Sequence, residues 1–284
     1  MKCMRNFFIL WVSVVLLAMS QENYASDVHV AHCFIECPKV SAADTEIVVR
    51  HLFAAAIDNS TGLPAWVAYR IHPDGLGVAS LLPRRWQTDR LLRTQAAYEL
   101  LERDGPNSLQ PILSGAPDSE ASEVRENSED MAYRTLSGEA APDSRARLAP
   151  LTSFAGTPYW EELNYLSNMA SFPADLRLGS WARLEMAINE LAQDGNELHV
   201  LAGPVRGLKQ SIFKVVRDGS AEAAFVFPSD LPRHADFCGQ ASTLEAIEAD
   251  TGLNLFPALA ETGRGSAASL LPALGCNVTT RNEP

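Results

Sequence analysis

"SIFKVVRDGSAEAAFVF", Ser211 to Phe227, is the stretch that decides the fold, because it has the pattern of a β-hairpin. Two runs rich in β-branched and aromatic residues flank Asp218-Gly219, a dipeptide that favours the tight turns between antiparallel strands. The run just before it, "ELHVLAGP" at 197–204, predicts another strand. Three strands are therefore expected in this part of the chain.

Helical patterns lie on both sides of these strands. Apolar residues recur every three or four positions from Leu178 to Leu191, which predicts an amphipathic helix over 178–193 that ends at the following Asp-Gly. The stretch "STLEAIEADTGL" predicts a second helix, with a capping box from Ser242 to Glu245 and an end at Gly252.

Earlier in the chain, strand and helix patterns also alternate irregularly. "AWVAYRI" at 65–71 predicts a strand, and residues 91–103 predict a helix that stops at Asp-Gly-Pro. We find no internal repeat and no βαβ rhythm. The mixture predicts a single α+β domain.

Residues 1–20 have the pattern of an export signal. Lys2 and Arg5 are followed by an apolar run of thirteen residues, Phe7 to Met19, and small residues offer a cleavage site near residue 20 or as late as 25. Thirteen residues are too few to span a bilayer, which takes about 20. We therefore expect an exported protein, periplasmic or extracellular, with a mature domain over 27–284 and no membrane attachment after cleavage.

The composition allows a large core and limits the partners. Of 284 residues, 46% are hydrophobic, and the formal net charge is −12. Loss of Lys2 and Arg5 leaves 21 cations against 35 acids, a mature charge of −14. This balance argues against a protein that coats nucleic acid through bulk charge, although a local basic cleft is compatible with it. Residues 115–143 hold eight acids against two arginines and predict a mobile acidic insertion.

Four cysteines remain after signal removal, and they allow three pairings. The economical pairing joins Cys33 to Cys37 across a tight loop and Cys238 to Cys276 near the C-terminus. Zinc binding is the competing interpretation. It is the weaker one, because Cys-x3-Cys with two distant partners lacks a consistent histidine spacing.

Three stretches carry the candidate site: "SRARLAP" at 144–150, "WEELNYLSNM" at 160–169 and "DLRLGSWARLE" at 175–185. Their order and spacing resemble the DNA/RNA non-specific endonuclease family, the secreted ββα-metal nucleases. Other similar stretches are "VVRHLFAAAIDNSTGLPAWVAYRI", "RRWQTD", "ADFC", "IEADTGL" and "LPALGC". The resemblance covers most of residues 33–276. It implies a single mixed domain with a central antiparallel sheet flanked by helices.

The resemblance also implies a chemistry. The family hydrolyses phosphodiesters with one hard cation, usually magnesium, held by a single asparagine and several waters, while a histidine activates the attacking water. That histidine belongs to Asp-Arg-Gly-His-x-Ala-Pro, where this chain has Arg147. The metal-binding asparagine of Leu-Asn-x-Gly-x-Trp falls on Arg177. Arginine stays protonated and has no lone pair to offer, so it neither accepts a proton nor binds a cation.

Other positions of the family's site are kept. By resemblance, Arg84 steadies the transition-state phosphate, Arg145 contacts phosphate, and Asn164 and Asn168 line the site. Glu185 matches the acid that holds metal-bound water, although a surface carboxylate paired with an arginine is an equally good interpretation here.

The two replacements predict the fold of a nuclease with little or no nuclease activity. Loss of a general base alone costs about 10²–10⁴ in rate. The leading hypothesis is that Arg84, Arg145, Arg147 and Arg177 form a metal-free site for phosphate or for the backbone of DNA or RNA. Magnesium, the family's cofactor, is doubtful here, and no metal ligand is expected beyond a water-mediated contact to Glu185.

Two alternatives stay open. One is an active magnesium-dependent nuclease with a relocated base, for which His72 is a candidate, and a metal held by Glu185 or Asp175. The other is a non-enzymatic interaction protein that uses the acidic insertion as a docking segment or as a flap. A homodimer is implied by the resemblance only.

Overall fold

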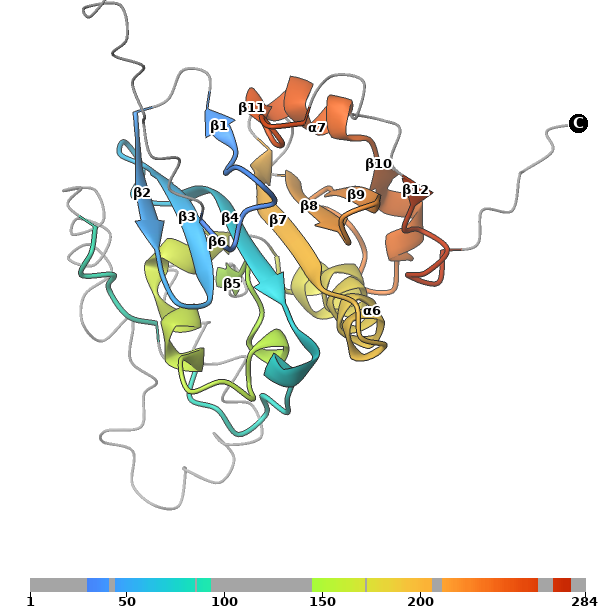
Figure 1. Cartoon of the computed structure of the whole chain (residues 1–284), viewed down its shortest axis with the longest axis horizontal. Coiled ribbons are helices and arrows are strands. Elements are labelled where there is room, and N and C mark those ends of the chain that lie inside the picture. The colour runs from blue at the N-terminus through green and yellow to red at the C-terminus, as the bar shows by residue number, and fades with distance from the viewer. Residues whose placement is uncertain are drawn as a thin grey trace, which may run out of the picture.

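The computed structural model describes residues 30–40, 44–84, 86–92, 145–171, 173–205, 211–259 and 268–276. Its large sheet contains β2 (Thr45–Val49), β3 (Phe53–Asp58), β4 (Pro64–Ile71), β7 (Leu198–Val205), β8 (Ser211–Arg217), β9 (Ala221–Phe227), β10 (Ala241–Ser242) and β12 (Ala268–Ser269). The strand order is β10-β9-β8-β7-β4-β3-β2, with β12 beside β9 (Figure 1). All pairs along this order are antiparallel, and β12 pairs with β9 in parallel.

Two short strand pairs and several helical segments complete the described fold. β1 (Lys39–Val40) pairs with β11 (Leu253–Asn254), and β5 (Arg145–Arg147) pairs with β6 (Met169–Ser171). The 3-10 turns are η1 (Pro73–Gly75), η2 (Leu151–Ser153), η3 (Trp160–Asn164), η4 (Leu166–Asn168) and η6 (Phe237–Gln240). The remaining helical segments are α5 (Ala174–Leu176), the π-helical turn η5 (Arg177–Trp181), α6 (Ala182–Gln193) and α7 (Leu244–Thr251).

Successive residues of a strand point to opposite sides of a sheet, and in β3, β4 and β8 the residues on both sides are buried. On β8, Ile212 and Val216 join the core that contains α6, whereas Phe213 and Val215 join the core that contains α7. The helix residues in these cores are Leu184, Ile188 and Ala192 of α6, and Leu244 and Ile247 of α7. Figure 1 accordingly shows α6 and α7 on different sides of the strands.

The segment before α6 is kinked at Gly179, whose backbone angles are φ −101° and ψ −116°. A Cβ atom on Gly179 would lie 2.3 Å from the carbonyl oxygen of Arg233, so no side chain fits there. The expected helix over 178–193 is therefore α-helical only from Ala182. The turn before it follows a π-helical path that is set by contact with a distant segment.

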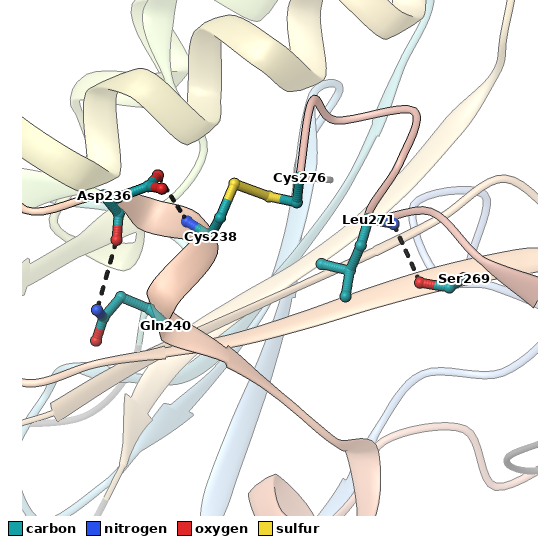
Figure 2. The surroundings of a disulfide bond; sticks show 6 residues. All are labelled: Asp236, Cys238, Gln240, Ser269, Leu271 and Cys276. Atoms are coloured by element: carbon teal, nitrogen blue, oxygen red, sulfur yellow. Dashed lines mark hydrogen bonds between the residues drawn. A yellow bond between two sulfur atoms is a disulfide. The ribbon is translucent and has the colours of Figure 1, made fainter. Parts of the chain in front are cut away.

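Two disulfides tie the ends of the described chain to the fold. Cys33–Cys37 closes a loop beside the α7 core, and Cys238–Cys276 joins η6 to the segment after β12 (Figure 2). In the second region the Asp236 carboxylate accepts a hydrogen bond from the Cys238 backbone N–H at 3.0 Å. The economical pairing of the cysteines is confirmed.

Most of the sequence-based elements are confirmed, including the α+β class. The strand over 65–71, the strand over 197–204 and the hairpin are β4, β7 and β8–β9, with Gly219 at φ 99° in the turn. The capping box at Ser242 is wrong. The cap is Thr243, whose hydroxyl accepts from the Ala246 N–H at 3.2 Å, and the helix ends at Gly252 as expected.

Several sequence-based expectations concern residues that the structure does not describe. The signal at 1–20, nearly all of the helix over 91–103 and the acidic insertion over 115–143 lie outside the described residues. In the part of the chain that the structure describes, no helix is long and apolar enough to cross a membrane.

Candidate functional site

A cavity of about 150 Å³ opens between the first motif stretch, at 144–150, and the third, at 175–185. The described residues that line it are Ala79, Arg84, Ala146, Arg147, Pro150, Leu151, Thr152, Arg177, Leu178, Trp181 and Glu185. Three arginines and one glutamate thus share a wall that is otherwise mostly apolar. Four of the residues singled out in the sequence are brought together here: Arg84, Arg147, Arg177 and Glu185.

The first motif enters the site along β5, where Arg147 pairs with Met169 of β6. The residues after it are fixed by Asn168, whose side-chain oxygen accepts from the Ala149 N–H at 2.8 Å. The Asn168 amide nitrogen donates to the carbonyl oxygens of Ala149 and Leu163 at 2.9 and 3.0 Å. Asn168 is fully buried, so it holds the backbone of the motif in place from behind the cavity.

The Arg147 guanidinium is held by Asn164, Arg84 and Trp86. Its Nε donates to Asn164 Oδ1 at 3.1 Å, and its Nη2 donates to the carbonyl oxygen of Arg84 at 3.0 Å. Its Cζ atom lies 4.5 Å from the ring centroid of Trp86, a cation–π distance. Asn164 is itself anchored, since its Nδ2 donates to the carbonyl oxygen of Pro83 at 3.0 Å. The guanidinium is therefore held in one position at the cavity wall.

The third motif reaches the cavity from a single face of the η5–α6 segment. Arg177, Trp181 and Glu185 are four residues apart, a spacing that places side chains on one face of a helix. All three line the cavity. The kink at Gly179 lies inside this segment, so the same turn that packs against residue 233 also sets the position of Arg177.

Glu185 forms a buried ion pair with Lys214 of β8. The Lys214 Nζ lies 2.9 Å from Glu185 Oε1 and 3.8 Å from the ring centroid of Trp181. The Lys214 side chain is fully buried, and that of Glu185 is 15% exposed. Trp181 packs edge-on against Phe227, with ring centroids 5.7 Å apart. The pair thus lies between the sheet and α6, and Glu185 contacts the cavity.

Burial acts on both members of this pair. It raises the pKa of the Glu185 carboxyl, although Lys214, a hydrogen bond from Trp181 and the charge of Arg147 act in the opposite direction. Burial also lowers the pKa of the Lys214 ammonium, and Glu185 opposes that shift. With an ammonium hydrogen-bonded to one oxygen and a guanidinium nearby, we take Glu185 and Lys214 as a charged pair at neutral pH.

Other residues singled out in the sequence lie away from the cavity wall. Arg145 shares strand β5 with Arg147, and the asparagines of the second motif lie behind the wall. His72 lies 3.8 Å from Glu197 on the exposed surface, and His51 is held by Glu162 at 2.8 Å. Neither histidine lines the cavity in the described structure.

Lys214 and Trp86 are site residues that the sequence analysis missed. Lys214 had a usable signal, because it is the one charged residue within the apolar run "SIFKVV" of the hairpin. A lysine at such a position is buried only when it is paired. Trp86 follows directly on "RR" in the motif "RRWQTD", but its packing against Arg147 depends on segments far apart in the sequence.

Comparison with known proteins agrees with the fold. The model of the DNA/RNA non-specific endonuclease family matches residues 38–262, so this chain belongs to that family. It is 27% identical over 286 aligned positions to a nuclease of Serratia marcescens, covering 92% of this chain and 95% of the relative.

A solved structure is similar in fold. A chain in the crystal structure of the EndoG/EndoGI complex, which addresses the mechanism of EndoG inhibition, superposes with a TM-score of 0.53. It is 14% identical in sequence, and the match covers 77% of this chain and 88% of that one. The similarity supports the mixed α+β architecture described above.

Proposed function

We propose that this chain is an exported member of its family that binds nucleic-acid phosphate in the arginine-lined cavity and has little or no nuclease activity. One observation carries the proposal: Arg147 and Arg177 line the same cavity as Arg84 and Glu185. By resemblance, these two arginines stand where the family has its general base and its metal ligand. Guanidinium groups bind phosphate oxygens through charge-assisted, often bidentate hydrogen bonds.

The side chains of the cavity do not suit a magnesium ion. Magnesium prefers oxygen ligands, and Glu185, the one carboxylate among the described lining residues, already accepts from the Lys214 ammonium. Arg147 and Arg177 would repel a dication placed beside it. Among the described residues, no group of three His, Cys, Asp or Glu side chains is close enough to hold a metal. The donor set favours an anion.

Among the described residues that line the cavity, none is a suitable general base. Arg147 keeps its proton at every physiological pH, and its contacts with Asn164 and Arg84 hold it as a donor. Glu185 lies in an ion pair with Lys214, which stabilises the ionised carboxylate but occupies one of its oxygens. These contacts support phosphate binding without efficient hydrolysis.

The test is a nuclease assay with magnesium on the wild type and on the double variant Arg147→His, Arg177→Asn. We expect little or no plasmid degradation by the wild type, restored degradation by the double variant, and salt-sensitive binding of DNA or RNA by the wild type. Arg90→Gln, which removes an exposed cation outside the cavity lining, is the matched control. Efficient magnesium-dependent cleavage of plasmid DNA by the wild type would contradict the proposal.

Export is the second part of the proposal. It is supported by the two disulfides, since such bonds persist in oxidising compartments, and by the pattern of residues 1–20. Mass spectrometry of the mature protein in the periplasm or medium should show an N-terminus near residue 20–26. Recovery of the uncleaved chain from the cytosol with free thiols would contradict it.

A further inference from the structure

Lys214 is a buried charged residue whose position in the core is not explained by stability. Its side chain is fully buried on β8, and its cross-strand neighbours Ala202 and Phe225 are buried apolar residues. Well-packed apolar residues are often as stable as a buried ion pair, or more stable, so packing alone gives no reason for a lysine here. Its partner Glu185, which lines the cavity, supplies a reason.

We propose that Lys214 is a positioning residue that makes the cavity accept an anion, because its ammonium holds and neutralises the Glu185 carboxylate, which would otherwise repel phosphate. This inference rests on the proposed function, since it concerns the ligand specificity of the same site. Lys214 is not among the described residues that line the cavity. It therefore acts through Glu185 and does not touch the ligand.

The geometry places the ammonium against the wall of the cavity. The Lys214 Nζ donates to Glu185 Oε1 at 2.9 Å and lies 3.8 Å from the ring centroid of Trp181, which also lines the cavity. The Glu185 side chain keeps an exposed fraction of 15%, so an unpaired charge on it would act directly on a ligand in the cavity. An ammonium at hydrogen-bond distance offsets that charge at its source.

Few other groups among the described residues act on the Glu185 carboxylate. Arg147 favours its ionised form through its charge, and Trp181 does so through a hydrogen bond. Burial, and after it the charge of Glu185, raise the pKa of Tyr69 on β4 well above its ordinary value of 10, so Tyr69 is neutral at pH 8. Lys214 is therefore the ammonium that balances the carboxylate in this part of the core.

The effect of Lys214 can be separated from that of the arginines. Arg84, Arg147 and Arg177 have contacts of their own within the protein, and all three are present in every variant of residues 185 and 214. Loss of the ammonium changes the charge behind the wall by one unit. At an effective dielectric constant of about 20, one unit charge within about 10 Å of a phosphate monoanion changes its affinity about tenfold or more.

The experiment compares the wild type with Lys214→Met and with the double variant Lys214→Met, Glu185→Gln. Titration calorimetry at pH 8, in a low-salt buffer with a chelator, measures the affinity for inorganic phosphate and for a single-stranded oligonucleotide. We expect Lys214→Met to bind both ligands about tenfold more weakly than the wild type, and the double variant to recover to within about threefold of it. The two variants share the lost lysine and differ in the charge of residue 185, so a purely structural role of Lys214 would leave both equally weak.

Folding of each variant is checked by circular dichroism before titration. If Lys214→Met does not fold, Glu185→Gln alone is decisive. It should bind phosphate at least as tightly as the wild type, because it removes the carboxylate that Lys214 offsets. Weaker binding by Glu185→Gln, equal weakness of the two Lys214 variants, or unaltered binding by folded Lys214→Met would overturn this inference and leave the proposed phosphate site standing.

Two arginine variants locate the ligand. Arg177→Gln should abolish binding, whereas Arg90→Gln, which removes an exposed cation outside the described lining, should keep it. Binding that survives Arg177→Gln would place the ligand outside the cavity and overturn both proposals. Absence of binding of either ligand by the wild type would overturn the proposed function itself.

Discussion

Replacing Lys214 by methionine should destabilise the protein strongly, because Lys214 is fully buried and its ammonium lies 2.9 Å from Glu185. Methionine fills a similar volume but leaves the carboxylate without its partner. Breaking a buried ion pair from one side costs about 3–5 kcal/mol in the free energy of unfolding. The change also removes the cation–π contact with Trp181, which adds to the loss.

Urea unfolding at pH 7 measures this free energy. The matched control is Lys39→Met, because Lys39 is 68% exposed in a surface pair with Glu36, a kind of pair that contributes about 0–1 kcal/mol. The double variant Lys214→Met, Glu185→Leu removes both charges, so it should recover most of the stability lost by the single variant. A single-variant loss no larger than that of the control, or a double variant no more stable than the single one, would refute the buried ion pair.

The loss of stability in the Lys214→Met variant should depend on pH. Without Lys214, the pKa of Glu185 should rise further above its ordinary value of 4.5, because burial then acts unopposed by the ammonium. A carboxyl whose folded pKa is raised contributes stability that is present below its unfolded pKa and is lost as the pH rises through its folded pKa. The stability deficit of Lys214→Met should therefore be small near pH 4 and grow towards pH 8. A deficit that is constant over this range would contradict the assignment.

Three further substitutions test the supports of the site. Asn164→Ala removes the acceptor that holds Arg147, so oligonucleotide affinity in calorimetry should fall about two- to tenfold. Because Asn164 is buried and also donates to the Pro83 carbonyl oxygen, the melting temperature should fall as well, by the equivalent of about 1–3 kcal/mol; an unchanged affinity would show that the anchoring is unimportant. Gly179→Ala places a Cβ 2.3 Å from the carbonyl oxygen of Arg233, and thermal unfolding should show a loss of about 1–3 kcal/mol together with weaker binding. Cys276→Ser opens a crosslink between residues 38 positions apart, which should cost about 4 kcal/mol in urea unfolding on a loop-entropy basis; a wild-type midpoint would contradict it.

The sequence was sufficient to predict a helix or strand where the local residue pattern matches the burial of that element in the structure. β4, β7 and the hairpin are recognisable because their apolar runs are bounded by turn residues, and Gly219 supplies the positive φ of the turn. The buried helix face that contains Leu184 and Ile188 follows from the spacing of the apolar residues alone. The fold class could therefore be predicted from short segments, with the family resemblance adding the central antiparallel sheet.

The sequence-based expectations that were wrong or incomplete mostly concern positions whose conformation depends on contacts between distant segments. The turn before α6 is π-helical because Gly179 lies against the backbone of residue 233, which no local pattern reveals. The cap at Thr243 in place of Ser242 shows a different limit, since both residue types cap well and a shift of one position cannot be resolved by propensity. The roles of the asparagines were also inaccessible, because their partners are main-chain groups of other loops and the Arg147 guanidinium.

A cavity lined by arginines reverses the expected effect of magnesium. In a metal-dependent hydrolase, adding the metal ion increases the catalytic activity and adding a chelator abolishes it. Here the positive charge is part of the polypeptide, in Arg84, Arg147 and Arg177, and is present whatever the supply of metal. A free dication would instead associate with the phosphate ligand and compete with the protein for it. Under the proposed function, added magnesium is therefore expected to weaken binding and a chelator to strengthen it.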